Sequence, residues 1–292
     1  MVGYVCTIAG GKGGVGKTTT AVNVAAALEK AGYDVVVLDA DLGMSNLGAM
    51  LDVDVETSIH EILAGGRAVS DALTQAQGGL TVVPGEQSLE AFADADPANL
   101  KKVVKTLRNA YDVVLIDSGA GLSHETTVPL GLADGIIVVT TPDDVAVGDA
   151  VKTRELADRL DGNVLGALLT RVKQAGDAED IGDRLSVELM AVVPEDVQAT
   201  VDEPLVLNSP ESPAAESYQN LSMVLESIFF KATDPADIDT VVEDAWFEEG
   251  YTASADAIDT ATGPTAEASE EETEEEAADD DDDDDATFGL FN

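Results

Sequence analysis

The chain has 292 residues, of which 58 are acidic and 15 are basic, so its formal net charge is −43 at pH 7. Nine lysines and six arginines disfavour a protein that binds the nucleic acid backbone, because that binding depends on basic side chains. The single cysteine, Cys6, excludes an intramolecular disulfide framework and fits a reducing compartment.

The first predicted strand, Val5–Ile8, leads into a phosphate-binding loop. Residues 11–18 fit the pattern G-x-x-x-x-G-K-[ST], and a helix-forming run, Ala21–Lys30, follows them. Glycines let such a loop curl so that backbone N–H groups and the start of the helix surround the phosphates of a nucleotide. Lys17 supplies a positive charge to those phosphates, and the Thr18 hydroxyl is a ligand for Mg²⁺. The alternative is a chance match in a glycine-rich turn, which the flanking strand and helix argue against.

Two later strands end in carboxylates. The apolar run Val35–Leu38 precedes Asp39 and Asp41, and the run Val113–Ile116 precedes Asp117. Such runs of Val, Leu and Ile are typical of parallel strands covered on both faces, whose carboxyl ends open onto the crevice where the sheet binds ligands. Phosphoryl transfer needs a metal anchor and a group that orients water, so we interpret Asp117 as holding Mg²⁺ through a water molecule. For Asp39 or Asp41, the alternative role is to cap the following turn.

Strands and helices alternate along residues 1–231, and this alternation predicts the fold class. It favours right-handed crossovers and an α/β domain with one doubly wound, mostly parallel sheet flanked by helices. A last helix, Ser217–Lys231, follows a proline-rich turn and closes the predicted domain. The other predicted strands are Leu80–Val83, Gly135–Thr140, Val164–Leu169 and Leu189–Val193, and the other predicted helices are Asn99–Ala110, Asp149–Leu160 and Ala178–Ser186.

The composition changes after Lys231. Positions 232–292 hold 23 of the acidic residues and no Lys or Arg, which leaves 35 acidic and 15 basic residues in the first 231 positions. Residues 232–251 retain enough helical periodicity for a peripheral helix. Residues 252–292 form an acidic, low-complexity tail that we expect to be disordered, because it has too little apolar surface to offset chain entropy. The chain ends in an apolar stretch from Phe288 to Phe291, which is either a chance ending or a short docking peptide.

The phosphate-binding loop resembles one particular variant of its motif. The run from Lys12 to Thr19 is similar to the deviant Walker A motif of the MinD/ParA family. In that family the early lysine reaches across a dimer interface to the phosphates of the partner subunit, whereas an ordinary loop lysine is solvated. The resemblance implies catalytic roles for Lys12 and Lys17. The loop residues that it implies for ATP binding are Gly11, Lys12, Gly13, Gly14, Val15, Gly16, Lys17, Thr18 and Thr19.

The resemblance extends to the two segments that carry the carboxylates. Asp39 and Asp41 resemble the switch I pair of the family, which implies that Asp41 positions or activates water and that Asp39 lies near the metal. The segment from Asp117 to Gly121 resembles switch II, with Gly119 where the family usually has proline. The implied metal residues are therefore Thr18, Asp39 and Asp117, and Gly121 joins the implied nucleotide contacts.

Base recognition is the weakest part of the resemblance. Family members often read adenine with an asparagine at the end of a later strand, where this chain has Thr170 followed by Arg171. The loop that begins at Pro194 and continues to Asp196 matches better. Arg171, Pro194 and Asp196 are therefore the expected contacts near the base, and the absence of the guanine-reading pattern N-K-x-D indicates ATP.

The resemblance covers residues 1–231 and leans toward MinD. It implies an ATPase that forms a homodimer around ATP, binds a partner protein or surface, and releases it after slow, partner-stimulated hydrolysis. The expected function is to position a division site or a polar surface machinery, and the alternative is a ParA-like partitioning ATPase. Two further readings are an iron–sulfur carrier, which needs paired cysteines, and a scaffold that binds nucleotide without turnover.

The acidic composition also predicts the source of the protein, and the distribution of apolar residues predicts its location. An acid-coated chain stays hydrated in concentrated salt, which indicates a halophilic, archaeal source. The sequence contains no apolar stretch approaching 20 residues and no basic amphipathic helix, so membrane spanning and direct lipid binding by the tail are disfavoured. We expect a cytoplasmic protein that concentrates at the poles or reaches the membrane periphery through a partner. The remaining mode of direct lipid binding is insertion of Trp246 and Phe247 into the bilayer when molar salt screens the acidic charge.

Overall fold

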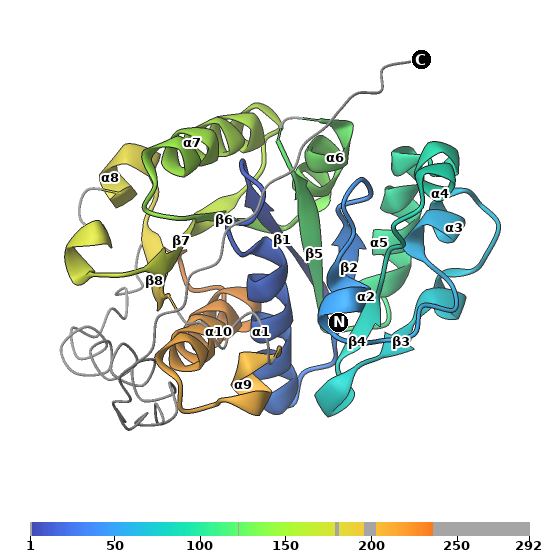
Figure 1. The fold of residues 1–292 in the computed structure, drawn as a ribbon, viewed down its shortest axis with the longest axis horizontal. Helices are drawn as coiled ribbons and strands as arrows, with labels where there is room; N and C mark the ends of the chain where they lie inside the picture. The colour runs from blue at the N-terminus through green and yellow to red at the C-terminus, as the bar shows by residue number, and fades with distance from the viewer. Residues whose placement is uncertain (1, 122, 179–180, 196–202, 236–292) are drawn as a thin grey trace, which may run out of the picture. The chain divides into compact units, whose positions relative to one another are not determined.

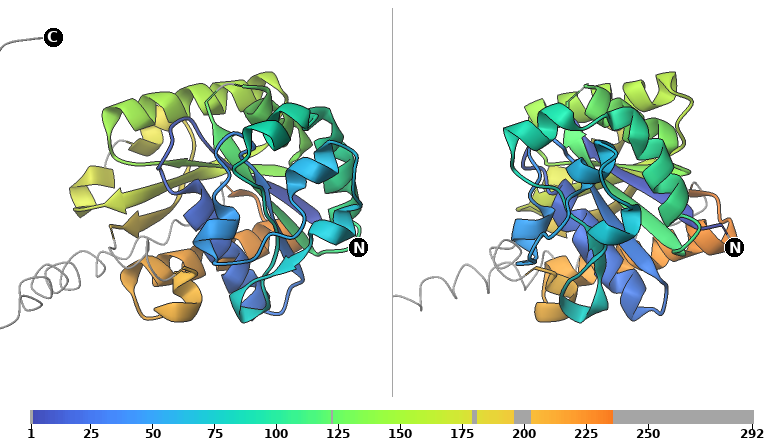
Figure 2. Two further views of the ribbon diagram at one scale, coloured as in Figure 1. Left: turned by 45° about the vertical axis from the view of Figure 1, so that its right-hand side comes forward. Right: turned by 90° about the vertical axis from the view of Figure 1, so that its right-hand side faces the viewer.

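The computed structural model describes residues 2–121, 123–178, 181–195 and 203–235. Its centre is an eight-stranded sheet with the strand order β3-β4-β2-β5-β1-β6-β7-β8, flanked by helices on both faces (Figures 1 and 2). All of its strand pairs are parallel except β3 with β4. The strands are β1 (Tyr4–Gly10), β2 (Val35–Ala40), β3 (Thr74–Gln75), β4 (Thr81–Val83), β5 (Val113–Ala120), β6 (Gly135–Thr140), β7 (Val164–Val172) and β8 (Leu189–Pro194). The predicted α/β fold is therefore confirmed.

Two groups of helices cover the sheet. On one face, α1 packs against α10 and against β1 and β5, and α10 covers β8. On the other face, α7 packs on β6 and β7, and α6 packs on β1 and β5. The helices are α1 (Lys17–Lys30), α2 (Leu47–Met50), α3 (Ile59–Leu63), α4 (Leu89–Asp94), α5 (Leu100–Leu107), α6 (His124–Leu132), α7 (Asp144–Arg159), α8 (Ile181–Leu185), α9 (Leu205–Asn208) and α10 (Pro213–Lys231).

Strand β1 is the central element because it pairs with both β5 and β6. Tyr4 is the register partner of Val113, and Cys6 is the register partner of Gly135. The side chain of Cys6 is fully buried in this core. The carboxyl ends of β1, β2, β5, β6 and β7 consequently meet at one edge, where the loop after β1 lies.

Some predicted boundaries differ from the structure for local reasons. Helix α7 begins five residues earlier than the predicted Asp149, because Asp143 caps it by accepting a hydrogen bond from the Ala146 N–H at 2.9 Å. Helix α10 begins before the predicted Ser217, because Ser212 caps it and Pro213 occupies its first turn. Within the predicted helix Ala178–Ser186, the structure describes α8 over Ile181–Leu185, while residues 179 and 180 lie outside the described ranges.

The parts beyond α10 fall largely outside the described residues. Contacts divide the chain into a unit of Met1–Ala253 and a unit of Ser254–Asn292. The predicted peripheral helix at 232–251 is described only as far as residue 235, and the predicted tail lies outside the described ranges. Among the described residues, no helix is long and apolar enough to cross a bilayer.

Candidate functional site

The phosphate-binding loop lies between β1 and α1, and its backbone uses the freedom of its glycines. Gly14 and Gly16 have φ angles of 78° and 94°, in the left-handed region that favours glycine. Gly11 lies so close to α7 that an added Cβ would be 2.3 Å from the carbonyl oxygen of Asp149. The predicted loop therefore forms a tight turn at the N-terminus of α1, where N–H groups and the helix dipole favour an anion.

The carboxylates of Asp39 and Asp117 lie beside each other at the ends of β2 and β5. The two residues are register partners on neighbouring strands, and each is 1% exposed. The hydroxyl of Thr18 donates to Asp117 Oδ2 at 2.6 Å, whereas Asp117 Oδ1 is buried and has no hydrogen-bond partner among the described residues. A buried carboxylate oxygen without a partner, next to a hydroxyl, is a donor set that suits a hard divalent cation.

Burial and mutual repulsion destabilise the charged forms of this pair. Burial, followed by the neighbouring Asp39 charge, raises the pKa of Asp117 to about 8, although Thr18 and Lys17 act in the opposite direction. Burial also raises the pKa of Asp39, against a hydrogen bond from Ser45 Oγ at 2.6 Å. A divalent cation offsets such repulsion. The residues predicted for the metal therefore fit Mg²⁺ in both chemistry and placement.

The side chain of Asp41 contacts its own turn and lies near Gly119 in the last part of β5. Its Oδ1 accepts from the Met44 N–H at 3.1 Å, and its N–H donates to Asp39 Oδ1 at 3.1 Å. Oδ1 also lies 3.4 Å from the position that a Cβ on Gly119 would occupy. Asp41 thus caps a turn, as the alternative reading expected, and it also faces the second switch segment.

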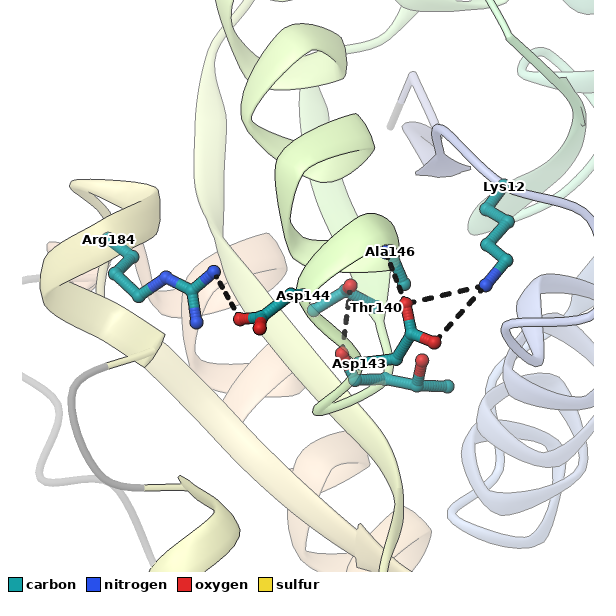
Figure 3. Close-up of polar contacts among 7 residues, drawn as sticks. Lys12, Thr140, Asp143, Asp144, Ala146 and Arg184 are labelled. Carbon is teal, nitrogen blue, oxygen red and sulfur yellow. Dashed lines mark hydrogen bonds and ion pairs between the residues drawn. The ribbon is translucent and has the colours of Figure 1, made fainter.

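Lys12 points away from its own loop, toward the N-terminus of α7 (Figure 3). Its ammonium lies 3.4 Å from Asp143 Oδ1, and the two side chains are 41% and 49% exposed. The Ala146 N–H is the main cause that lowers the pKa of Asp143, and the Lys12 charge adds to it. In this chain, then, the ammonium of Lys12 is paired with α7.

Of the three residues predicted to contact the base, Arg171 lines a cavity beside the loop. The cavity has a volume of about 510 Å³ and is lined by Lys12, Arg171, Lys173 and Glu195, among others. Lys173 and Glu195 form an ion pair at 3.3 Å. Arg171 is exposed, with a φ angle of 56°.

The other residues predicted to contact the nucleotide lie on several elements. Pro194 is the last residue of β8, and Thr19 lies in the first turn of α1. Gly121 follows β5 with a φ angle of 92°. Asp196 lies outside the described residues.

Sequence reasoning missed several side chains that hold the site. Asn46 Oδ1 lies 3.1 Å from the Thr18 hydroxyl oxygen. The Nε2 atom of the buried His60 ring lies 2.9 Å from the Leu42 carbonyl oxygen. The hydroxyl of Thr170 is directed at the phosphate-binding loop. Among these side chains, only Thr170 could have been noticed in the sequence, because it replaces the asparagine that is frequent in the family. The contacts of Asn46 and His60 join segments that are far apart in the sequence.

The chain is similar in sequence to a known family and to several known proteins. A family model described as an AAA domain matches residues 3–156. An ATP-binding protein of Methanocaldococcus jannaschii is 34% identical over 242 residues, which cover 80% of this chain and 91% of the relative. The septum site-determining protein MinD of Synechocystis is 31% identical over 238 residues, which cover 76% of this chain and 89% of the relative.

A solved structure has the same fold. The septum site-determining protein MinD of Pyrococcus horikoshii, complexed with Mg-ADP, superposes with a TM-score of 0.73 at 33% sequence identity. The match covers 80% of this chain and 99% of that chain. The nucleotide in that structure is ADP and its metal is Mg²⁺.

Proposed function

Since this chain belongs to the MinD/ParA family of P-loop ATPases and resembles MinD, we propose that it is a dimeric switch that positions a cellular structure. It hydrolyses ATP to ADP and phosphate, with Mg²⁺. In the proposed cycle, the ATP-bound dimer recruits a partner and hydrolysis releases it. The structure positioned is a division site or a polar surface machinery, in keeping with the septum site-determining relatives.

We assign the chemistry to residues at the ends of β1, β2 and β5. Lys17 and the N–H groups of the loop bind the β- and γ-phosphates. Thr18, Asp39 and Asp117 hold Mg²⁺, which when bound neutralises charge on the phosphate oxygens. Asp41 orients the attacking water from the rim of the site. This division of roles rests on burial, because Asp39 and Asp117 are 1% exposed whereas Asp41 lies half-buried near the surface.

The position of Lys12 supports the proposal that the protein forms a dimer. Its ammonium lies outside its own phosphate-binding loop, on a side chain that is 41% exposed and that, within the described part of the chain, is held only by the surface ion pair with Asp143. Exposed pairs of this kind contribute about 0–1 kcal/mol, so little free energy is needed to redirect the lysine. We propose that it leaves Asp143 and contacts the nucleotide of the partner subunit.

Localisation of a tagged protein in cells tests the positioning function. We expect foci or a gradient at the poles, at mid-cell or along the membrane periphery for the wild type. The Asp41→Ala variant should have an altered pattern, because it remains in the ATP-bound state. Diffuse fluorescence of both proteins, at normal expression levels, would contradict the proposal.

A ParA-like partitioning ATPase is the alternative, and one surface favours it. Lys101, Lys102 and Lys105 are exposed on α5 and form a basic cluster in an acidic chain. Charge reversal at all three positions would abolish DNA binding if this face contacted phosphates. Absence of DNA binding by the wild-type protein with ATP, at low and at high salt, removes this alternative. The iron–sulfur reading is disfavoured because Cys6 is fully buried within β1.

A further inference from the structure

Thr170 connects the end of β7 to the phosphate-binding loop. The residue is 3% exposed, and its Oγ1 lies 2.7 Å from the Val15 carbonyl oxygen and 3.1 Å from the Thr140 carbonyl oxygen. A hydroxyl has one hydrogen to donate. The Val15 carbonyl oxygen is the closer of the two acceptors, so it accepts the stronger hydrogen bond. The donor of Thr170 is thereby committed to the backbone of the loop.

This contact fixes the direction of the next N–H group. The peptide bond between Val15 and Gly16 is trans, so its C=O and N–H groups point in opposite directions. Because the Val15 carbonyl faces Thr170, the Gly16 N–H points away from β7 and toward the hollow of the loop. That side is where an anion at the N-terminus of α1 would be bound.

Packing supports the same arrangement. Both Cγ2 and Oγ1 of Thr170 lie 3.6 Å from the position that a Cβ on Gly16 would occupy. The Gly16 carbonyl accepts from the Thr20 N–H at 2.8 Å and from the Thr20 hydroxyl at 2.7 Å, which holds the other side of the residue. Gly16 is therefore held from both sides, by β7 and by α1.

We infer that Thr170 is a positioning residue that orients the Gly16 N–H toward the phosphates and takes no part in reading the base. The inference rests on the ATP site described above. A residue of this kind changes phosphate affinity equally for every nucleotide. A residue that reads the base changes the affinity for one nucleotide relative to another.

The test compares ATP and GTP binding, each with Mg²⁺, in matched variants of the full chain. Thr170→Val removes the hydroxyl and keeps the shape, and we expect affinities for ATP and GTP to fall together by about tenfold, the order of one buried hydrogen bond. Their ratio should stay within twofold of the wild-type ratio. Thr170→Ser retains the hydroxyl and should bind both nucleotides within about threefold of wild type. Should the valine variant not fold, Thr170→Ala provides the same comparison.

Thr7→Val is the control for general destabilisation. The Thr7 hydroxyl is also buried and donates to a backbone carbonyl, that of Pro129 at 3.0 Å, but it does not contact the loop. We expect this variant to lose stability without losing nucleotide affinity. A changed ATP-to-GTP ratio in Thr170→Val, or unchanged affinity for both nucleotides, would overturn the inference. A wild-type protein that binds neither nucleotide would instead contradict the ATPase assignment.

Discussion

We expect substitutions at Lys17 and Asp41 to separate nucleotide binding from turnover. We expect Lys17→Ala to weaken ATP binding by about 10- to 100-fold, because the phosphates lose a charge-assisted hydrogen bond. We expect Asp41→Ala to retain ATP affinity and to lower kcat by about a hundredfold or more, because water is no longer oriented. Equilibrium binding and steady-state hydrolysis on the purified variants measure both effects. Hydrolysis by Asp41→Ala at the wild-type rate would refute the switch I assignment.

We expect substitutions at Lys12 and Asp143 to change dimerisation in opposite directions. With a non-hydrolysable ATP analogue in high salt, Lys12→Ala should lower the dimer fraction while monomer affinity for nucleotide stays within a few-fold. Asp143→Asn keeps an oxygen for the cap of α7 but removes the charge that holds Lys12, so the dimer fraction should rise. Light scattering measures the fractions, with Lys152→Ala as the surface-lysine control. Equal dimer fractions in all four proteins would exclude a role for Lys12.

The residues of the site were predictable to different degrees. Asp39 and Asp117 could be placed together from the sequence, because neighbouring parallel strands end at the same edge of a sheet. The contacts of Thr170 with Val15 and of Lys12 with Asp143 join positions that are 155 and 131 residues apart. No local pattern specifies such pairs, since they depend on the order of strands in the sheet.

At the scale of elements, the contact between the loop and α7 makes a pair of glycine variants informative. In Gly11→Ala, the new Cβ would meet the backbone of Asp149, so the loop or the helix must shift. We expect a loss of about 1–3 kcal/mol in the free energy of unfolding, together with weaker ATP binding. Gly148→Ala, within α7, adds its Cβ to open space and should stabilise the helix by about 0.5–1 kcal/mol. Denaturant titrations distinguish the two, and equal stabilities would contradict the packing argument.

Long elements were predicted better than short ones for a physical reason. Strand β6 and the first half of β5 are continuous apolar runs, and α1 is a run of 14 residues rich in alanine, so both kinds of element are visible in the sequence. Helices α3 and α4 have five and six residues, which is too short for a helical period to show. Strand β3 has two residues and is defined only by its pairing with β4. Local caps mark the starts of the two helices, at Ser58 for α3 and Ser88 for α4, whereas β3 depends on its tertiary pairing.

At the scale of the whole molecule, the acidic tail should be separable from the ATPase. We expect deletion of residues 252–292 to leave the free energy of unfolding and the basal ATPase rate nearly unchanged, because this segment has few apolar residues before Phe288. The same deletion should disturb localisation or partner binding. Deleting only residues 286–292 tests the role of the apolar tip. Normal localisation of that variant would mean that the tail serves only to keep the protein hydrated. A tail deletion that abolishes hydrolysis would contradict the predicted boundary.

The central position of β1 also determines when the site can form during synthesis. Tyr4 pairs with Val113, and the loop after β1 is held by Thr170, so the chain must be complete to about β7 before the loop has its neighbours. At about 5–20 residues per second, this interval is on the order of ten seconds on the ribosome. Long-range parallel pairing of this kind also folds slowly. Nucleotide bound at this loop is therefore expected to stabilise the chain only after the strands up to β7 have been made.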